Sequence, residues 1–125
     1  MADTQNLRKR LENEAILSKK YQIQQFALSV LPALDNLDRA LETPSKDEAM
    51  RKGVSMVRDQ LWNALQAEGV TEIEAENKPF DSRYHHAILA EQVEGVEEGI
   101  VLEVLQKGYM LKDRLLRAAL VKVSE

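Results

Sequence analysis

The feature that most limits how this chain can fold is an apolar stripe that begins at Ile23 and ends at Leu41. Its six members are separated alternately by four and three residues: Ile23, Ala27, Val30, Leu34, Leu37 and Leu41. A repeat of about 3.5 residues keeps one face of a helix turned toward another helix over several turns. A lone helix would leave this stripe in water and would be poorly stable. We therefore expect it to pair, with a second copy in a homodimer or, alternatively, with the chain's own second helix.

The residues before and around this stripe predict a long helix that is interrupted once. Residues 1–42 contain no glycine and one proline, Pro32. Proline removes a backbone donor and clashes with the preceding turn, so we expect a kink or a restart near Pro32. Upstream, Asn13 and Lys20 occupy places that a tight heptad would fill with Leu or Ile, which predicts a loosely packed stalk. Residues 1–42 are thus expected to form the stalk and dimerisation helix.

A second helix is predicted over residues 45–69. Ser45 and Glu48 have the spacing of a capping box, and Gly69 is suited to end a helix. Leu61 belongs to the apolar face of this helix, and we expect it at the dimer interface as well. Two helices from each of two chains would form a dimeric four-helix bundle.

The residues after the second helix change to the period of strands. Residues 71–75 and 86–93 are expected to form short strands, and residues 100–105 alternate with a period of two. Residues 115–123 are apolar on nearly both sides, as in a covered central strand. Arg114 lies where the chain turns back, so the sequence predicts a hairpin with this arginine at its tip.

Taken together, these patterns predict an α+β fold. A long N-terminal helix, paired as a dimeric parallel coiled coil, leads into the dimeric four-helix bundle. Residues 70–125 then form a small C-terminal all-β domain. The apolar stretches are all shorter than the ~20 residues that a membrane span requires, and the N-terminus has neither a secretory nor a transit pattern. We expect a cytoplasmic protein that does not bind membranes.

Composition and spacing argue against an enzyme. The chain has no cysteine, and its two histidines, His85 and His86, are adjacent, so in a strand they point to opposite faces. Zinc needs at least three protein ligands, and we expect no metal site. The serines are not in a nucleophile elbow, and no glycine-rich phosphate loop is present. We therefore expect no catalytic residues, no cofactor and no small-molecule substrate. The net charge of −4 argues against nucleic-acid binding.

Four segments resemble, in the same order, the motifs of one protein family. They are QNLRKR at 5–10, LPALDNLDRAL at 31–41, KPFDSRYHHA at 78–87 and the hairpin sequence from Gly108 to Val123. The chain resembles the GrpE-type nucleotide exchange factors, which serve DnaK-type chaperones. Ser82 and Ala118 stand where many members have proline. By this resemblance the chain is expected to begin inside the stalk, without the longer coiled coil and acidic leader typical of the family.

The resemblance implies a homodimer whose β-domain opens the ATPase domain of the chaperone and accelerates ADP release. Arg114 matches the family's hairpin arginine and is the first expected contact. The other residues expected at the chaperone are Leu105, Lys107, Tyr109, Arg8 and Arg10. An alternative role for Tyr109 is to shape the hairpin. Periodicity and composition alone also allow a dimeric coiled-coil adaptor without exchange activity.

Overall fold

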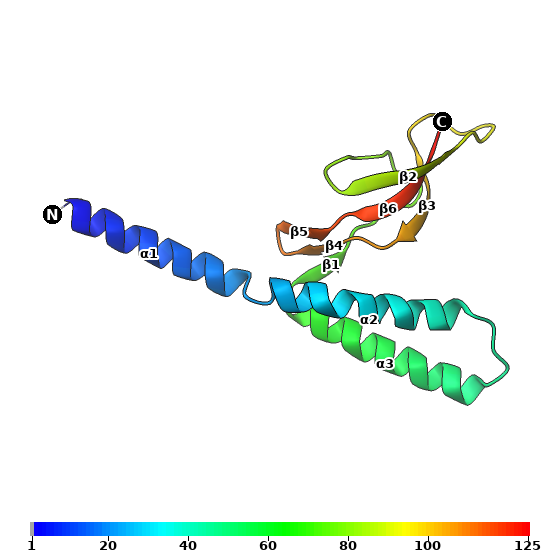
Figure 1. The fold of residues 1–125 in the computed structure, drawn as a ribbon, viewed down its shortest axis with the longest axis horizontal. Coiled ribbons are helices and arrows are strands. Elements are labelled where there is room, and N and C mark those ends of the chain that lie inside the picture. Colours follow the sequence, from blue (N-terminus) through cyan, green and yellow to red (C-terminus); the bar gives the residue numbers. More distant parts are fainter. Residues whose placement is uncertain (1) are drawn as a thin grey trace.

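The computed structural model describes residues 2–125, which form three helices followed by six strands (Figure 1). The helices are α1 (Ala2–Lys20), α2 (Gln24–Glu42) and α3 (Glu48–Ala67). The strands are β1 (Val70–Glu72), β2 (His85–Glu91), β3 (Val101–Gln106), β4 (Tyr109–Leu111), β5 (Arg114–Arg117) and β6 (Ala119–Ser124). The helix α1 projects away from the rest of the chain, while α2 and α3 run side by side below the strands (Figure 1). The expected α+β class, with helices first and strands last, is confirmed.

The long N-terminal helix is interrupted at residues 21–23, which we call the helix break. The helix α1 ends at Lys20 and α2 begins at Gln24. Pro32, where we expected a kink or a restart, lies inside α2. Leu31 and Leu34, on either side of the proline, are fully buried. Their packing stabilises α2 although proline cannot donate a backbone hydrogen bond. The restart therefore lies earlier in the chain than the proline predicted.

The second long helix of the helix pair, α3, begins slightly later than its capping pattern predicted. Asp47 is the N-cap, because its carboxylate accepts a hydrogen bond of 3.0 Å from the backbone N–H of Met50. The hydroxyl of Ser45, the residue that we expected to cap the helix, instead accepts a 3.1 Å hydrogen bond from the N–H of Asp47. At the other end, Gly69 has φ +98°, the left-handed conformation that glycine adopts at low cost after a helix.

The strands form two small sheets rather than one long hairpin. One sheet has the order β1–β4–β5 and is antiparallel. The other has the order β2–β6–β3, in which β6 is the central strand, parallel to β2 and antiparallel to β3. The central position expected for residues 115–123 is thus confirmed for β6. The remainder of that segment, from Leu115 to Arg117, belongs to β5 in the other sheet.

The chain changes sheets at Gly108, and only glycine fits there. A Cβ at this position would lie 2.8 Å from the carbonyl carbon of Ala118 and 2.9 Å from the Cα of Ala119. Real Cβ atoms do not approach backbone atoms so closely. This crossing ends the pairing of β3 with β6, and β4 and β5 continue as a separate short hairpin.

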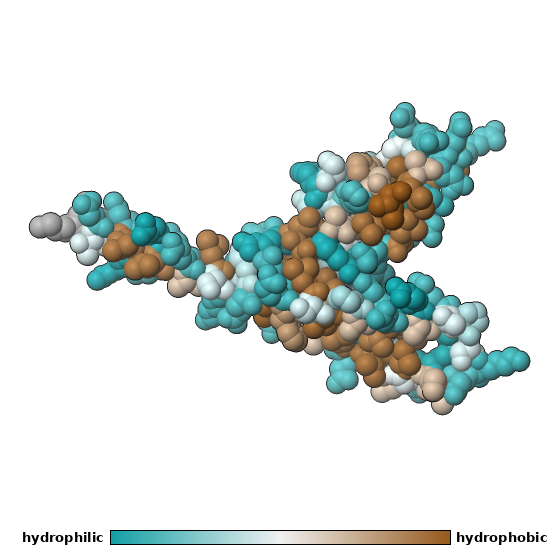
Figure 2. Space-filling view, in the orientation of Figure 1, coloured by the Kyte–Doolittle hydropathy of each residue, from teal (hydrophilic) through white to brown (hydrophobic). Residues whose placement is uncertain are grey.

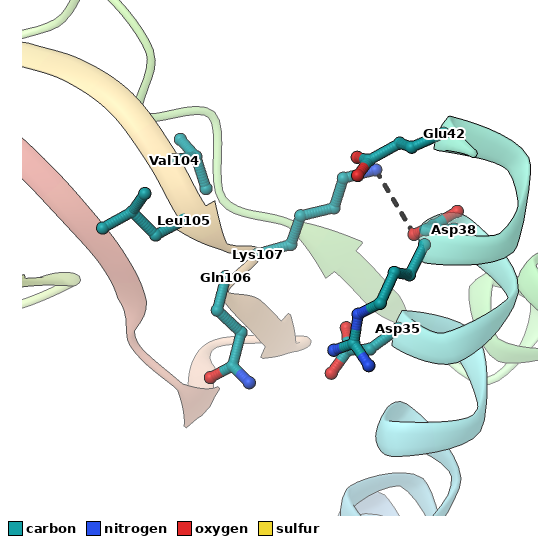
Figure 3. Close-up of a pocket in the computed structure, with 8 residues that line it drawn as sticks. Asp35, Asp38, Glu42, Val104, Leu105, Gln106 and Lys107 are labelled. Carbon is teal, nitrogen blue, oxygen red and sulfur yellow. Dashed lines mark ion pairs between the residues drawn. The ribbon is translucent and has the colours of Figure 1, made fainter. Parts of the chain in front are cut away.

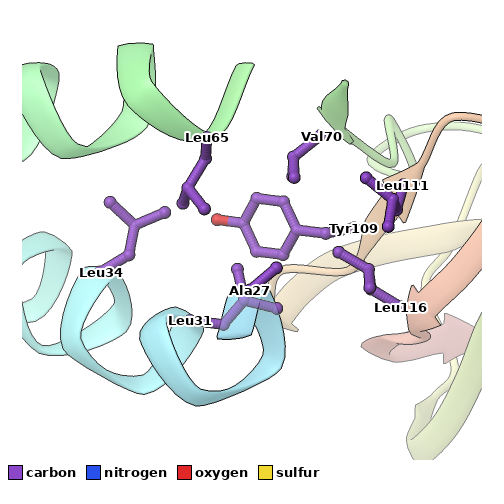
Figure 4. Packing of buried hydrophobic residues seen from close by; sticks show 8 residues of the cluster. All are labelled: Ala27, Leu31, Leu34, Leu65, Val70, Tyr109, Leu111 and Leu116. Atoms are coloured by element: carbon purple, nitrogen blue, oxygen red, sulfur yellow. The ribbon is translucent and has the colours of Figure 1, made fainter. Parts of the chain in front are cut away.

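The core that joins helices to strands is centred on Tyr109. Its ring has no exposed surface and enters the space between α2 and α3 (Figure 4). The buried residues of this cluster come from both layers: Ala27, Leu31, Leu34, Leu65, Val70, Tyr109, Leu111 and Leu116. A second buried cluster belongs to the β2–β6–β3 sheet and the segment before it: Ala75, Val101, Ala119 and Val121. The first sheet and the helix pair therefore share one apolar core. Within residues 2–125, no helix combines the length and hydropathy required to traverse a bilayer.

Candidate functional site

The turn of the β4–β5 hairpin presents three polar side chains, which we call the hairpin tip: Lys112, Asp113 and Arg114. Leu111 of β4 pairs with Arg114 of β5, so the turn between the strands consists of only two residues. Lys112 adopts φ +55°, the left-handed conformation common in such tight turns. All three tip residues are exposed. Arg114 therefore lies at the turn, where the sequence predicted it.

Arg114 contacts the helix break from the strand side. Its Nη1 donates a 2.7 Å hydrogen bond to Oε1 of Gln24, the first residue of α2. The centre of its guanidinium group lies 3.8 Å from the centroid of the Tyr21 ring, which is a close cation–π contact. The arginine is thus held by two residues that are about ninety positions earlier in the chain.

The other two tip residues also contact the break. The Tyr21 hydroxyl donates a hydrogen bond to the carboxylate of Asp113, and Lys20 Nζ lies 3.3 Å from the other carboxylate oxygen. Lys112 Nζ donates a 2.8 Å hydrogen bond to the backbone carbonyl of Lys20 at the end of α1. The hydrogen bond from Tyr21, followed by that from Lys20, holds the pKa of Asp113 below its ordinary value. The pKa of Lys20 is raised, first by its interaction with Tyr21 and then by its hydrogen bond to Asp113.

A second group of charges joins α2 to the strands. Arg117 binds Asp35 in a bidentate pair with both N–O distances at 2.7 Å. Arg117 Nε also donates a 2.8 Å hydrogen bond to the carbonyl of Lys107. Both side chains of the pair are less than one-fifth exposed, at 19% and 16%. This pair fixes β5 against α2.

Next to the pair of Arg117 and Asp35, the carboxylate of Asp38 lies between two cations. Arg58 Nε donates to Asp38 Oδ1 at 2.7 Å, and the pair raises the pKa of Arg58. Lys107 Nζ lies 3.5 Å from Asp38 Oδ2 and 3.3 Å from a carboxylate oxygen of Glu72. The first distance is that of an ion pair and is long for a hydrogen bond. Lys107, an expected chaperone contact, is therefore engaged within the chain.

Three of these charged residues, Asp35, Asp38 and Lys107, line a cleft of about 150 Å³ between α2 and β3 (Figure 3). Asp35, Asp38 and Glu42 line it from the helix, and Leu105 and Lys107 line it from the strand side. Two of the three carboxylates are already paired with cations. Within residues 2–125, no group of three or more histidine or acidic side chains is arranged to hold a metal ion. The cleft is best described as a charged joint between helices and strands.

The two histidines lie as the sequence predicted. His85 is 7% exposed, and its Nδ1 accepts a 3.0 Å hydrogen bond from the backbone N–H of Asp81. His86 is exposed. Adjacent residues of β2 thus point to opposite faces, so the pair does not form one site.

The remaining residues that were expected at a chaperone occupy different environments. Leu105 is 40% exposed on β3. Arg8 and Arg10 are exposed on α1, which extends away from the strands (Figure 1). Tyr109, by contrast, is fully buried and has no surface to offer a partner. Burial raises the pKa of its hydroxyl, which keeps the ring neutral inside the core.

The residues expected at the dimer interface divide into three groups. Ala27 and Leu34 are fully buried within the chain, because they pack in the cluster around Tyr109. Ile23, Val30 and Leu61 instead line an open apolar groove of about 220 Å³ between α2 and α3. Leu37 and Leu41 are half-buried. The surface left for a second copy is therefore narrower than the stripe in the sequence.

Apolar side chains that the stripe did not include are also exposed on the helices. Phe26, at the edge of the groove, is 68% exposed, and Met50 and Met56 of α3 are 65% and 64% exposed. Figure 2 shows apolar side chains gathered along the helices. Exposed leucines and an isoleucine continue along α1: Leu7, Leu11, Ile16 and Leu17.

Sequence reasoning identified Arg114 but not the residues that hold the strands on the helices. Asp35 and Asp38 lie within the segment 31–41, three residues apart, so they share one face of α2. Arg117 is the second arginine of the hairpin sequence. Two acidic residues on one helix face and an arginine in a later strand could have predicted that ion pairs join this helix to the strands. Tyr21 and Gln24 carried no such signal.

Comparison with known proteins places these features in a family. The GrpE family profile matches residues 1–125. Protein GrpE of Geobacillus kaustophilus (strain HTA426) is 46% identical over 127 residues, covering 99% of this chain and 60% of the relative. Protein GrpE of Acholeplasma laidlawii (strain PG-8A) is 40% identical over 128 residues, covering 100% of this chain and 67% of the relative.

A third relative gives the same result. Protein GrpE of Staphylococcus aureus (strain JH9) is 39% identical over 127 residues, covering 99% of this chain and 61% of the relative. The chain thus spans about three-fifths to two-thirds of the length of these curated relatives. The matched residues 1–125 span the helix break, the hairpin tip and the charged joint between α2 and the strands. This chain belongs to the GrpE family.

Proposed function

We propose that this chain is a nucleotide exchange factor that binds the ATPase domain of a DnaK-type chaperone, opens its nucleotide cleft and accelerates ADP release. The observation that carries this proposal is the match of the GrpE family over the whole chain. In this role the chain performs no chemistry and acts as a co-chaperone rather than as an enzyme. An exchange factor that prefers the open cleft lowers the chaperone's affinity for nucleotide. Bound nucleotide lowers the chaperone's affinity for the exchange factor by the same factor, because the coupling is reciprocal.

We propose Arg114 as the principal contact with the chaperone. Its guanidinium is exposed at the hairpin tip and offers five donors, which suit carboxylates and backbone carbonyls at the edge of an ATPase lobe. Leu105 and Lys107 are proposed as neighbouring contacts, and Arg8 and Arg10 on α1 as a second contact region. The buried position of Tyr109 supports a different role for it, which is to fix the hairpin from inside.

We propose that the chain acts as a homodimer through the helices. The apolar groove between α2 and α3, with Phe26 at its edge, supports a second copy as its occupant, because exposed apolar side chains run along all three helices. The proposed interface consists of Ile23, Phe26, Val30, Leu37, Leu41 and Leu61. Residues 1–42 would then be the stalk and dimerisation segment, 45–69 the second bundle helix and 70–125 the β-domain. We propose a cytoplasmic location, as is typical of the family.

Oligomeric state is tested by light scattering on a sizing column. We expect twice the chain mass of 14.2 kDa for the native protein and a shift toward the single-chain mass for Phe26→Glu. The matched control is Glu48→Ala on α3. A native protein that elutes as a single chain at micromolar concentration would contradict the dimer.

Exchange activity is tested by stopped-flow fluorescence. The chaperone's ATPase domain is loaded with a fluorescent ADP analogue, and its release is followed with and without this protein. We expect saturating protein to increase the release rate, and Arg114→Ala to reduce this stimulation without changing the dimer mass. Lys46→Ala removes an exposed positive charge from the loop between α2 and α3 and serves as the control. An unchanged release rate with the native protein would leave the coiled-coil adaptor as the better description.

A further inference from the structure

The helix break is not explained by the residues that form it. From Leu17 to Leu28 the sequence is LSKKYQIQQFAL, which contains neither glycine nor proline. Lys, Gln, Leu and Ala are good helix formers, and none of the other residues in this stretch interrupts helices as proline or glycine does. Local sequence therefore predicts one continuous helix through residues 21–23, whereas the structure has a turn there.

Backbone hydrogen bonds show how the helix is interrupted. In a continuous helix the N–H of Gln24 would donate to the carbonyl of Lys20. Here the N–H of Gln24 donates to the carbonyl of Tyr21 at 3.0 Å. The carbonyl of Lys20 accepts instead from Lys112 Nζ, at 2.8 Å. A cation thus satisfies the last carbonyl of α1, as lysine can at a helix C-terminus, and it comes from the hairpin tip.

The other two tip residues hold the side chains of the break in the same place. Asp113 accepts hydrogen bonds from Tyr21 and Lys20, and Arg114 binds Gln24 and the Tyr21 ring. Every residue of the tip therefore contacts the end of α1, the break or the start of α2. The hairpin itself is anchored behind the tip by the burial of Tyr109. The contact that interrupts the helix is thus attached to the core that joins strands and helices.

We propose that the hairpin tip is a clasp that imposes the helix break, and that a partner which binds Arg114 opens it and lets α1 and α2 join into one helix. When the clasp opens, Lys112 leaves the carbonyl of Lys20, and the N–H of Gln24 returns to that carbonyl. The direction of α1 then changes relative to the strands. The first half of this proposal depends only on contacts within the chain. The second half rests on the proposed function, because it takes the chaperone as the partner of Arg114.

The coupling runs in both directions. A partner that removes the guanidinium from Gln24 and Tyr21 favours the continuous helix, and any change that favours the continuous helix makes Arg114 more available to that partner. A change in the stalk or in the hairpin can therefore shift the same equilibrium, between the interrupted helix and the continuous one.

Distance measurements between spin labels test the clasp. The chain has no cysteine, so introduced Lys9→Cys and Glu94→Cys would be the only thiols, one on α1 and one in the loop after β2. Labelled chains are mixed with an excess of unlabelled chains, so that a dimer carries at most one labelled chain. We expect one narrow distance population for the native sequence. The double variant Lys112→Met with Asp113→Asn, which removes both charges while keeping an unbranched chain and an isosteric amide, should shift most of the population to a second distance.

Two further variants serve as a graded test and a control for this result. Gln24→Ala alone removes one surface contact of Arg114 and should produce a smaller shift in the same direction. Gln25→Ala, at an adjacent exposed position, should leave the distance unchanged. Circular dichroism of each variant verifies that the helices and strands are retained. A folded double variant whose distance population equals that of the native sequence would overturn the clasp.

The partner arm uses the ATPase domain of a DnaK-type chaperone added to the native labelled protein. Binding itself is followed separately by sedimentation. We expect bound protein to show the second distance population of the double variant. Binding without any change in distance would overturn the coupling while leaving the proposed function intact. Failure to bind would refute the proposed function. The distance measurement on the double variant would still show whether the hairpin tip imposes the helix break.

Discussion

The ion pair between Arg117 and Asp35 is expected to be one of the strongest single interactions between the strands and the helices. Its two hydrogen bonds of 2.7 Å join β5 directly to α2. The change that tests it is Asp35→Ala, which leaves Arg117 without its carboxylate. Arg117 would retain only the carbonyl of Lys107 and the face of the Tyr109 ring, whose centroid is 5.3 Å away.

The magnitude follows from the burial of the pair. Two unit charges about 4 Å apart attract each other by roughly 4 kcal/mol at an effective dielectric constant of about 20. Breaking a buried pair by removing one partner costs about 3–5 kcal/mol, whereas exposed pairs contribute less than about 1 kcal/mol. The exposed fractions of 19% and 16% place this pair nearer the buried case. Because Arg117 keeps two contacts, we expect Asp35→Ala to lower the free energy of unfolding by about 3 kcal/mol.

Urea unfolding followed by circular dichroism measures this loss. All variants are compared at one protein concentration, because the stability of a dimer depends on concentration. A double-mutant cycle with Arg117→Ala should give a coupling energy of about 2 kcal/mol. The control is Glu74→Ala, since Glu74 is 80% exposed and pairs with Lys78 at 3.1 Å, and it should cost less than about 0.5 kcal/mol. A coupling energy between Asp35 and Arg117 below about 1 kcal/mol would refute the reasoning.

Three further predictions follow from single positions. Gly108→Ala should destabilise the protein by roughly 1–3 kcal/mol, because its Cβ would collide with the backbone of Ala118; an unchanged melting temperature would contradict this. Tyr109→Phe should cost less than about 0.5 kcal/mol in urea unfolding, since the buried hydroxyl has no hydrogen-bond partner within residues 2–125. The hydrogen bonds from Arg83 lower the pKa of Asp81 to about 2, so carboxyl NMR titration of Arg83→Ala should show a higher value. In the native protein this interaction stabilises the fold above the ordinary pKa of 3.8 and is lost as pH falls through about 2.

The parts of the fold that were predictable depend on patterns along the chain. The stripe from Ile23 to Leu41 predicted a helix, and the nearly all-apolar run before Val123 predicted a central strand. Both depend on periods of local structure, which sequence displays directly. The adjacent histidines were predictable for the same reason, because neighbouring strand residues face opposite sides.

The parts that were not predictable depend on contacts between distant segments. Residues 21–23 interrupt the helix in contact with a hairpin tip about ninety residues away, so nothing near Tyr21 indicates the break. The stripe also did not reveal that Ala27 and Leu34 pack against Tyr109, because a period identifies an apolar face but not the surface that covers it. The start of α3 was displaced for a smaller reason, since Ser45 and Asp47 are both good N-cap residues.

The candidate site shows the same division. The turn position of Arg114 followed from the polar break in the hairpin sequence. Its partners Tyr21 and Gln24 did not, since neither belongs to a recognisable motif. Asp35 and Arg117 each stand in a segment that resembles the family, yet their pairing appears only when β5 lies against α2.

The order β2–β6–β3 places β2 and β3 at the edges of this sheet, and exposed strand edges promote aggregation in many proteins. Lys122 on β6 binds Glu91 of β2 at 2.9 Å and Glu103 of β3 at 3.4 Å, so a carboxylate is anchored on each outer strand. Charged side chains on outer strands are one of the devices that disfavour the addition of a strand from a neighbouring molecule. Chains crowded together in solution are thereby discouraged from growing into fibres by strand addition.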